Sequence, residues 1–120
     1  MVRRLNEQQA TINANMRGGE GEVRLEALLS ADELYDKGRI FSRAIIKPGC
    51  SVGYHVHENE MEAYVIISGS GDYNDNGTAV KVSAGDVTLT KSGEGHGMVN
   101  NGDETLVMIA LILHKDCRCG

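Results

Sequence analysis

The stretch GCSVGYHVHENEMEAYVIISG, residues 49–69, decides the fold of this chain. Between its terminal glycines lie His55, His57 and Glu62, and a third imidazole, His96, follows further along the chain. Successive side chains of a β-strand point to opposite faces, so His55 and His57 are predicted to point to the same side. Three imidazoles and one carboxylate are a usual ligand set for a divalent transition metal. The sequence therefore predicts a metal site inside a small β-barrel.

The four ligands are expected to reach one interior from different strands. Glu62 follows His57 across a short turn. If the strand of Glu62 pairs antiparallel with the strand of His57, its carboxylate returns to the same interior. His96 belongs to a different hairpin and is expected to complete the set from the facing sheet. Glu58 and Glu60, in the turn, are expected to be solvated.

Short apolar runs separated by glycine-rich turns continue on both sides of this stretch. Glycine accounts for 15 of the 120 residues, well above the usual share of about 7%. Asn76-Gly77 is a strong hairpin signal, and residues 100–103 are interpreted as another hairpin turn. A closed or two-sheet antiparallel barrel protects the edges of so many short strands. The predicted strands span residues 23–29, 40–47, 52–57, 62–67, 72–75, 78–82, 86–90, 96–100 and 105–113.

The chain is long enough for one domain. Residues 22–115 are predicted to form the barrel, with one helical turn near residues 30–37, where Ser30 and Glu33 match a capping box. Residues 1–21 are polar and are expected to form an N-terminal arm, either packed on a partner subunit or a loose end.

The C-terminal tail, residues 116–120, carries Cys117 and Cys119. Their Cys-x-Cys spacing suits a soft metal or redox chemistry, but a solvated tail is the simpler expectation. With Cys50 they make an odd number of cysteines, which does not resemble a disulfide framework. Because the first residues also lack an apolar secretory core, a cytoplasmic location is expected.

Charge narrows the range of partners. The formal net charge is −5, and the longest basic cluster is Arg3-Arg4. Phosphate backbones and anionic lipid surfaces require a basic footprint, and a membrane span requires about 18 or more consecutive apolar residues, which the chain lacks. The expected partner is a small molecule, with no nucleic acid and no membrane.

Two blocks of sequence resemble the motifs of the cupin superfamily. The segment Gly49-x5-His55-x-His57-x4-Glu62-x6-Gly69 matches the first motif at every position. The segment Gly85-x5-Lys91-Ser92-Gly93-x2-His96-x3-Asn100 matches the second motif with one departure. The family usually has proline where this chain has Lys91, which alters the expected loop but removes no ligand. The two motifs and the hairpin between them cover residues 49–100.

The resemblance implies an all-β fold, the cupin-type double-stranded β-helix or jelly-roll barrel, with a metal bound by His55, His57, Glu62 and His96. The chain looks most similar to small single-domain bacterial cupins, some labelled oxalate-decarboxylase-like and commonly dimeric, so a homodimer is expected. One divalent ion per chain is implied. Manganese, zinc, iron, nickel and cobalt all remain open, because ligand type alone does not select among them.

Three further side chains are candidates for the pocket. Tyr64 shares the face of Glu62 and either lines the pocket or packs in the core. Arg43 either anchors a substrate carboxylate or is simply exposed. Glu94, in a loop beside His96, either donates a proton to a bound molecule or lies at the edge of the pocket without a role.

Open coordination positions favour an enzyme acting on a small carboxylate or other metal-chelating substrate, by decarboxylation, isomerisation or oxygenation. The shortage of acid–base residues beyond the ligands leaves a non-catalytic binding or sensing module as the alternative. A closed structural metal site is a third reading. Oxalate decarboxylases carry an arginine where this chain has Val52, which ranks oxalate turnover below a reaction on another substrate.

Overall fold

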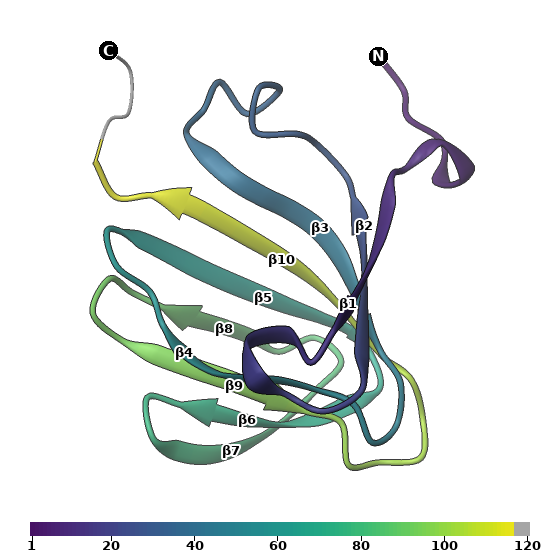
Figure 1. Ribbon diagram of the computed structural model, residues 1–120, viewed down its shortest axis with the longest axis vertical. Helices are drawn as coiled ribbons and strands as arrows, with labels where there is room; N and C mark the ends of the chain where they lie inside the picture. The colour runs from purple at the N-terminus through teal and green to yellow at the C-terminus, as the bar shows by residue number, and fades with distance from the viewer. Residues whose placement is uncertain (117–120) are drawn as a thin grey trace.

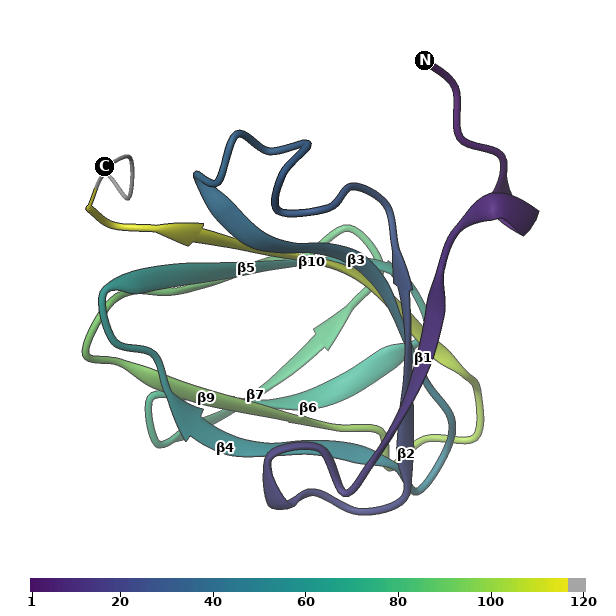
Figure 2. The same cartoon turned by 45° about the horizontal axis from the view of Figure 1, so that its top comes forward.

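The computed structural model describes residues 1–116, which form ten strands in two sheets. The larger sheet has the order β1-β2-β3-β10-β5-β8 and the smaller sheet the order β4-β9-β6-β7 (Figure 1). The two sheets face each other across the interior of the barrel (Figure 2). The strands are β1 (Ala10–Ala14), β2 (Glu22–Ala27), β3 (Gly38–Ile46), β4 (Ser51–Val56), β5 (Glu60–Ser68), β6 (Ser70–Asp75), β7 (Thr78–Ser83), β8 (Val87–Thr90), β9 (Gly95–Val99) and β10 (Leu106–His114). The predicted all-β class is confirmed.

Strand alternation and register divide the interior into an apolar half and a polar half. On β5, Glu62, Tyr64 and Ile66 point inward and are buried, as the alternation predicts. Toward one end of the barrel the buried side chains are apolar, such as Ile66 and the paired residues Val52 and Met98. Full burial of such a side chain contributes about 1.5–3 kcal/mol. Toward the other end, the same strands carry histidines and Glu62.

The Asn76-Gly77 hairpin is confirmed. Strands β6 and β7 pair with Asp75 opposite Thr78. Asn76 has φ 50° and Gly77 φ 100°, the left-handed pair that a two-residue hairpin turn needs.

The turn after β9, by contrast, is not a hairpin. Strand β9 belongs to the smaller sheet and β10 to the larger one, so residues 100–105 cross between the sheets. The fully buried Asn100 holds this crossover: its Nδ2 donates to the carbonyl oxygens of Ile46 and Glu104, both at 2.8 Å, and its Oδ1 accepts from Gly102 N at 3.1 Å. The hairpin interpretation is wrong because Asn and Gly indicate a turn without specifying which strands it joins.

Residues 1–21, expected to be an arm, contribute a strand to the chain's own barrel. Strand β1 pairs antiparallel with β2, from Ala10 opposite Glu26 to Ala14 opposite Glu22. The β1–β2 ribbon runs along one side of the barrel from the larger sheet to the smaller one (Figure 2). A short 3-10 turn, η2 (Met16–Gly18), follows β1 and lies against β4.

The helical segment expected near residues 30–37 consists of successive turns. Its capping box does form: Glu33 N donates to Ser30 Oγ at 3.2 Å, and Ser30 N donates to Glu33 Oε1 at 2.9 Å. Tyr35 and Asp36 have φ 55° and 56°. Because a right-handed helix cannot continue through left-handed residues, the segment remains a series of turns and no helix forms.

No helix among the described residues is long and apolar enough to span a membrane. Cys117 and Cys119 lie outside the described residues. Cys50 is a free, half-buried cysteine packed against the apolar core.

Candidate metal centre

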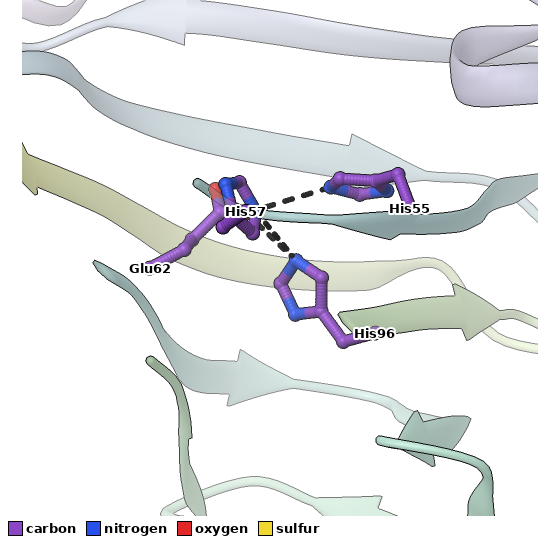
Figure 3. A group of neighbouring side chains, drawn as sticks. All are labelled: His55, His57, Glu62 and His96. Carbon is purple, nitrogen blue, oxygen red and sulfur yellow. Dashed lines mark hydrogen bonds and ion pairs between the residues drawn. The ribbon is translucent and has the colours of Figure 1, made fainter. Parts of the chain in front are cut away.

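The structure brings together the four side chains that the sequence singled out (Figure 3). His55 lies on β4, His57 directly after it, Glu62 on β5 and His96 on β9. Each offers one ligand atom, and these atoms all lie within 4.8 Å of one another. His57, Glu62 and His96 are buried and His55 is half-buried. The interior of the barrel therefore contains one convergent set of three imidazoles and a carboxylate.

The two sheets contribute to this set differently from our expectation. His55 lies opposite His96 in the β4–β9 ladder, so all three histidines come from the smaller sheet and its edge. Glu62 comes from the facing sheet, because β5 pairs with β8 and β10 rather than with β4. The turn between His57 and β5 is thus a crossing between sheets.

The donor atoms are spaced as ligands of one ion. Glu62 Oε1 lies 3.0 Å from His57 Nε2 and 2.9 Å from His96 Nε2, and the two nitrogens are 3.1 Å apart. His55 Nε2 is 4.0 Å from the same oxygen. Two ligands at right angles on an ion bound at about 2.1 Å lie roughly 3.0 Å apart, whereas tetrahedral neighbours lie roughly 3.4 Å apart. The residues present therefore fit a divalent ion.

Hydrogen bonds fix which nitrogen of His55 and His57 is free to bind. His55 Nδ1 lies 2.8 Å from the carbonyl oxygen of Gly53. His57 Nδ1 lies 2.8 Å from Glu60 Oε1. A carbonyl or carboxylate oxygen only accepts, so both Nδ1 atoms carry a proton, and Nε2 is the nitrogen of each ring that faces the centre. Partners of this kind orient metal-binding histidines and increase their basicity.

Glu60, expected to be solvated, instead links His57 to a cation. Arg39 Nε and Nη2 donate to the two Glu60 carboxylate oxygens at 2.8 and 2.9 Å. The hydrogen bond from Arg39 is the main cause that lowers the Glu60 pKa to about 2. Glu60 is therefore ionised at neutral pH and holds the His57 ring from behind. Its position three residues after His57, in the same turn, is the only sequence signal of this contact.

A second chain of groups, which the sequence analysis missed, holds His96. His96 Nδ1 lies 2.8 Å from Tyr73 Oη, which lies 2.8 Å from Thr90 Oγ1. With His96 donating to Tyr73 and Tyr73 donating to Thr90, His96 Nε2 is left free. The Tyr64 ring stacks on His96 with ring centroids 4.9 Å apart and planes 17° apart. Burial raises the pKa of Tyr64 well above its usual value, so this phenol stays neutral while it both packs in the core and lines the pocket.

The Glu62 carboxylate and the histidine rings affect each other's protonation. Burial opposes ionisation of Glu62, but hydrogen bonds from His57 and His96 lower its pKa to about 2. The hydrogen bond to Glu62 is in turn the main cause that raises the pKa of His57. Burial is the main cause that lowers the pKa of His55, and the positive charges of His96, His57 and Arg17 act in the same direction. A neutral imidazole is the form that binds metal. The ionised Glu62 and the neutral His55 therefore favour entry of a cation, and metal binding is expected to compete with protonation of His57.

A small pocket opens onto three of the four proposed ligands, His55, His57 and Glu62. It has a volume of about 70 Å³, with Val52, Met108 and Ile112 among its apolar walls. A water molecule needs about 10–15 Å³ on this measure, so the pocket suits a ligand of a few non-hydrogen atoms. Two cations, Arg17 and Arg39, also line it, and neither was expected from the sequence.

The structure does not bring Arg43 or Glu94 to the pocket. Arg43 lies between inward-facing neighbours on β3 and so points outward, where its Nη1 donates to Gln8 Oε1 at 2.9 Å and Glu26 Oε1 at 3.0 Å. Glu94 Oε1 accepts a hydrogen bond from Lys91 N at 2.9 Å and closes its own turn. Both side chains have structural partners in place of a ligand.

Known proteins share this sequence and geometry. A family model described as Cupin domain matches residues 42–112. The oxalate-binding protein of Thermotoga maritima is 47% identical over 100 residues, 83% of each chain. The crystal structure of a predicted oxalate decarboxylase from Thermotoga maritima has a TM-score of 0.91 and 45% identity, and the match covers 95% of this chain and 99% of that one. The polyketide cyclase RemF from Streptomyces resistomycificus, at 18% identity and a TM-score of 0.76 over 99% of this chain and 83% of its own, shares the fold.

Proposed function

The chain belongs to the cupin family, and from this premise we propose that it binds one divalent metal ion and uses the ion to hold a small carboxylate. The proposed ligands are His55, His57, Glu62 and His96. The observation that carries the proposal is the triangle of edges near 3 Å that joins two Nε2 atoms and one carboxylate oxygen. Two imidazole lone pairs aimed at each other repel, and a cation between them removes that repulsion. When bound, such an ion polarises a carboxylate or carbonyl oxygen as a Lewis acid.

The size and walls of the pocket support a small carboxylate. A volume of about 70 Å³ admits only a few non-hydrogen atoms. Its apolar walls limit the access of water to the bound ligand, and Arg17 and Arg39 supply positive charge. The relative at 47% identity is named an oxalate-binding protein, which makes oxalate the natural first ligand to test.

Binding has more support than turnover. The proton donor suggested by the sequence, Glu94, closes a turn away from the pocket. Apart from His55, His57, Glu62 and the two arginines, Tyr64 is the only titratable side chain that lines this pocket among residues 1–116. Its pKa is raised by burial, so it is a poor base. We therefore propose metal-dependent binding or sensing as the function, with decarboxylation, isomerisation or oxygenation as the second candidate because of the open coordination positions.

Calorimetry separates these functions. Metal-loaded protein is expected to bind oxalate with one equivalent per chain, whereas metal-free protein and His96→Ala are expected not to bind it. Release of carbon dioxide, or any product detected by mass spectrometry, would favour the catalytic alternative. Absence of binding to oxalate and other small carboxylates by the metal-loaded chain would contradict the proposal.

We also propose that the chain is a homodimer that pairs through the outer face of β5 and β8. Val65, Ile67, Val87 and Leu89 are 38–67% exposed on this face, and Val65 lies directly opposite Val87. A contiguous apolar patch of this kind is typical of an interface. Light scattering is expected to give twice the chain mass of 13.0 kDa and a monomer for Val87→Glu; a monomeric wild-type chain would contradict the proposal. A cytoplasmic location stays a prediction.

A further inference from the structure

Arg17 lines the pocket with its charge uncompensated. The other pocket cation, Arg39, is engaged by both carboxylate oxygens of Glu60. Arg17 forms no ion pair with any residue in the described part of the chain. It is exposed, whereas His55, which lines the same pocket, is half-buried. Arg17 therefore lies at the mouth of the pocket, close enough for its charge to act on His55 and without an ion-pair partner among the described residues.

The backbone around Arg17 is held in an unusual conformation. Arg17 has φ 54° and ψ 33°, in the left-handed region that residues with a side chain rarely adopt. Hydrogen bonds from Gly18 N to Asn15 O at 2.9 Å and from Gly19 N to Met16 O at 3.0 Å enclose it. Met16, next to it, packs against the core and also lines the pocket. The turn hydrogen bonds and the packing of Met16 therefore fix the backbone position of Arg17.

The segment that carries Arg17 lies directly on the strand that carries His55. A Cβ atom at Gly53 would collide with the carbonyl oxygen of Arg17, so glycine permits this close approach. Next to it, Ser51 N donates to Glu20 O at 2.9 Å, and Glu20 N donates to Ser51 Oγ at 2.8 Å. The Gly53 carbonyl oxygen is also the acceptor for His55 Nδ1. One residue of β4 thus sets both the Arg17 segment and the His55 ring.

The charges around the pocket indicate the kind of anion. Three neutral imidazoles, one carboxylate and a divalent ion leave a net charge of about +1 at the centre. The charges of Arg39 and Glu60 cancel, so Arg17 raises the net charge around the pocket from about +1 to about +2. A dianion neutralises this total, whereas a monoanion leaves one positive charge unpaired. The small pocket restricts the dianion to a few non-hydrogen atoms.

We propose that Arg17 is a ligand-binding residue that selects small dianions, its guanidinium pairing with a carboxylate of the molecule held at the metal centre. The inference rests on the proposed function and deepens it. Arginine suits this role because its planar fork matches a carboxylate through two parallel hydrogen bonds. The N-terminal segment thereby becomes part of the binding site.

The test compares oxalate, a dianion at neutral pH, with glycolate, a chelating monoanion. Both are titrated calorimetrically into manganese-loaded wild-type chain, Arg17→Gln and Arg4→Gln. Loss of a charge-assisted pair is expected to weaken oxalate binding to Arg17→Gln by about 10- to 100-fold, and glycolate binding by much less. Arg4→Gln removes the same charge outside the pocket and is expected to bind oxalate as the wild type does. Arg17→Lys is expected to be intermediate.

Metal affinity, measured separately by chelator competition, is expected to be unchanged in Arg17→Gln. If Arg17→Gln retains its metal and binds oxalate as tightly as Arg4→Gln does, the role of Arg17 is overturned while the proposed function stands. If the wild-type chain binds metal but neither carboxylate, the proposed function fails and this inference fails with it. An equal loss for both carboxylates would overturn the selection for dianions.

Discussion

Replacement of Glu60 tests how the barrel holds its metal ligands. Glu60 accepts the proton of His57 Nδ1 at 2.8 Å and is engaged on both oxygens by Arg39. Glu60→Ala removes the acceptor that orients the His57 ring and leaves the Arg39 charge uncompensated beside a cation site. Weaker metal binding is therefore expected without the loss of any direct ligand.

The magnitude follows from the role of the contact. Removing a partner that orients a metal-binding histidine weakens metal affinity by about 10- to 100-fold, which is about 1.4–2.7 kcal/mol. Glu60→Ala should lie at the upper end, because the freed Arg39 also repels the ion. Glu60→Gln keeps an oxygen that accepts from His57 Nδ1, so its metal affinity should fall by only about tenfold.

The assay is competition for zinc or manganese between the metal-free protein and a chromophoric chelator. Glu58→Gln is the matched control, because it removes the same charge from the same turn and Glu58 is exposed. Its metal affinity is expected to stay within about twofold of the wild-type value, as for other surface substitutions. Circular dichroism verifies that each variant remains folded.

Two results would refute this reasoning. One is a folded Glu60→Ala variant that binds metal as tightly as Glu58→Gln. The other is an equal loss in Glu58→Gln, which would reduce the effect to net charge. Either outcome would show that the contacts joining Arg39, Glu60 and His57 do not strengthen metal binding.

Three further predictions concern other parts of the barrel. Tyr73→Phe removes the hydroxyl that accepts from His96 Nδ1 and should weaken metal affinity by about tenfold in the same competition assay; unchanged affinity would show that His96 is oriented by packing alone. Asn100→Ala removes three hydrogen bonds of the sheet crossover, worth about 1 kcal/mol each, so urea unfolding should show a loss of about 3 kcal/mol; a loss below about 1 kcal/mol would contradict this role. The hydrogen bond from Arg3 is the main cause that lowers the Glu33 pKa from 4.5 to about 2, so its stabilisation is complete above pH 4.5 and is lost as the pH falls toward 2. The melting temperature of the wild type should therefore exceed that of Glu33→Gln at pH 6 and approach it in acid, and a difference independent of pH would contradict this.

Local patterns predicted much of the fold and the cluster at its centre. The two-residue spacing of His55 and His57 fixes their common face in any strand, and the same period places Tyr64 beside Glu62. Asn76-Gly77 specifies its hairpin because both residues accept left-handed backbone. These features depend only on neighbouring residues, so they can be read from the sequence.

Features that depend on long-range pairing could not be predicted in this way. Nothing near Glu62 indicates that β5 pairs with β10 rather than with β4, so the sequence pattern places its carboxylate on the wrong sheet. Residues 10–14 alternate apolar and polar residues over only five positions, too short a pattern to identify a strand in a polar segment, and their pairing with β2 appears only in the folded sheet. Arg17 reaches the pocket because its backbone turns left-handed against Gly53. Arg43, more conspicuous in the sequence, faces outward.

The most direct test of the account is a crystal structure of metal-supplemented protein, with anomalous diffraction at the metal edge and elemental analysis of the same sample. The account predicts one ion per chain, within about 2.0–2.3 Å of the Nε2 atoms of His55, His57 and His96 and of Glu62 Oε1. An ion bound elsewhere, or a metal-free centre in which His57 and His96 still bond directly to Glu62, would contradict it.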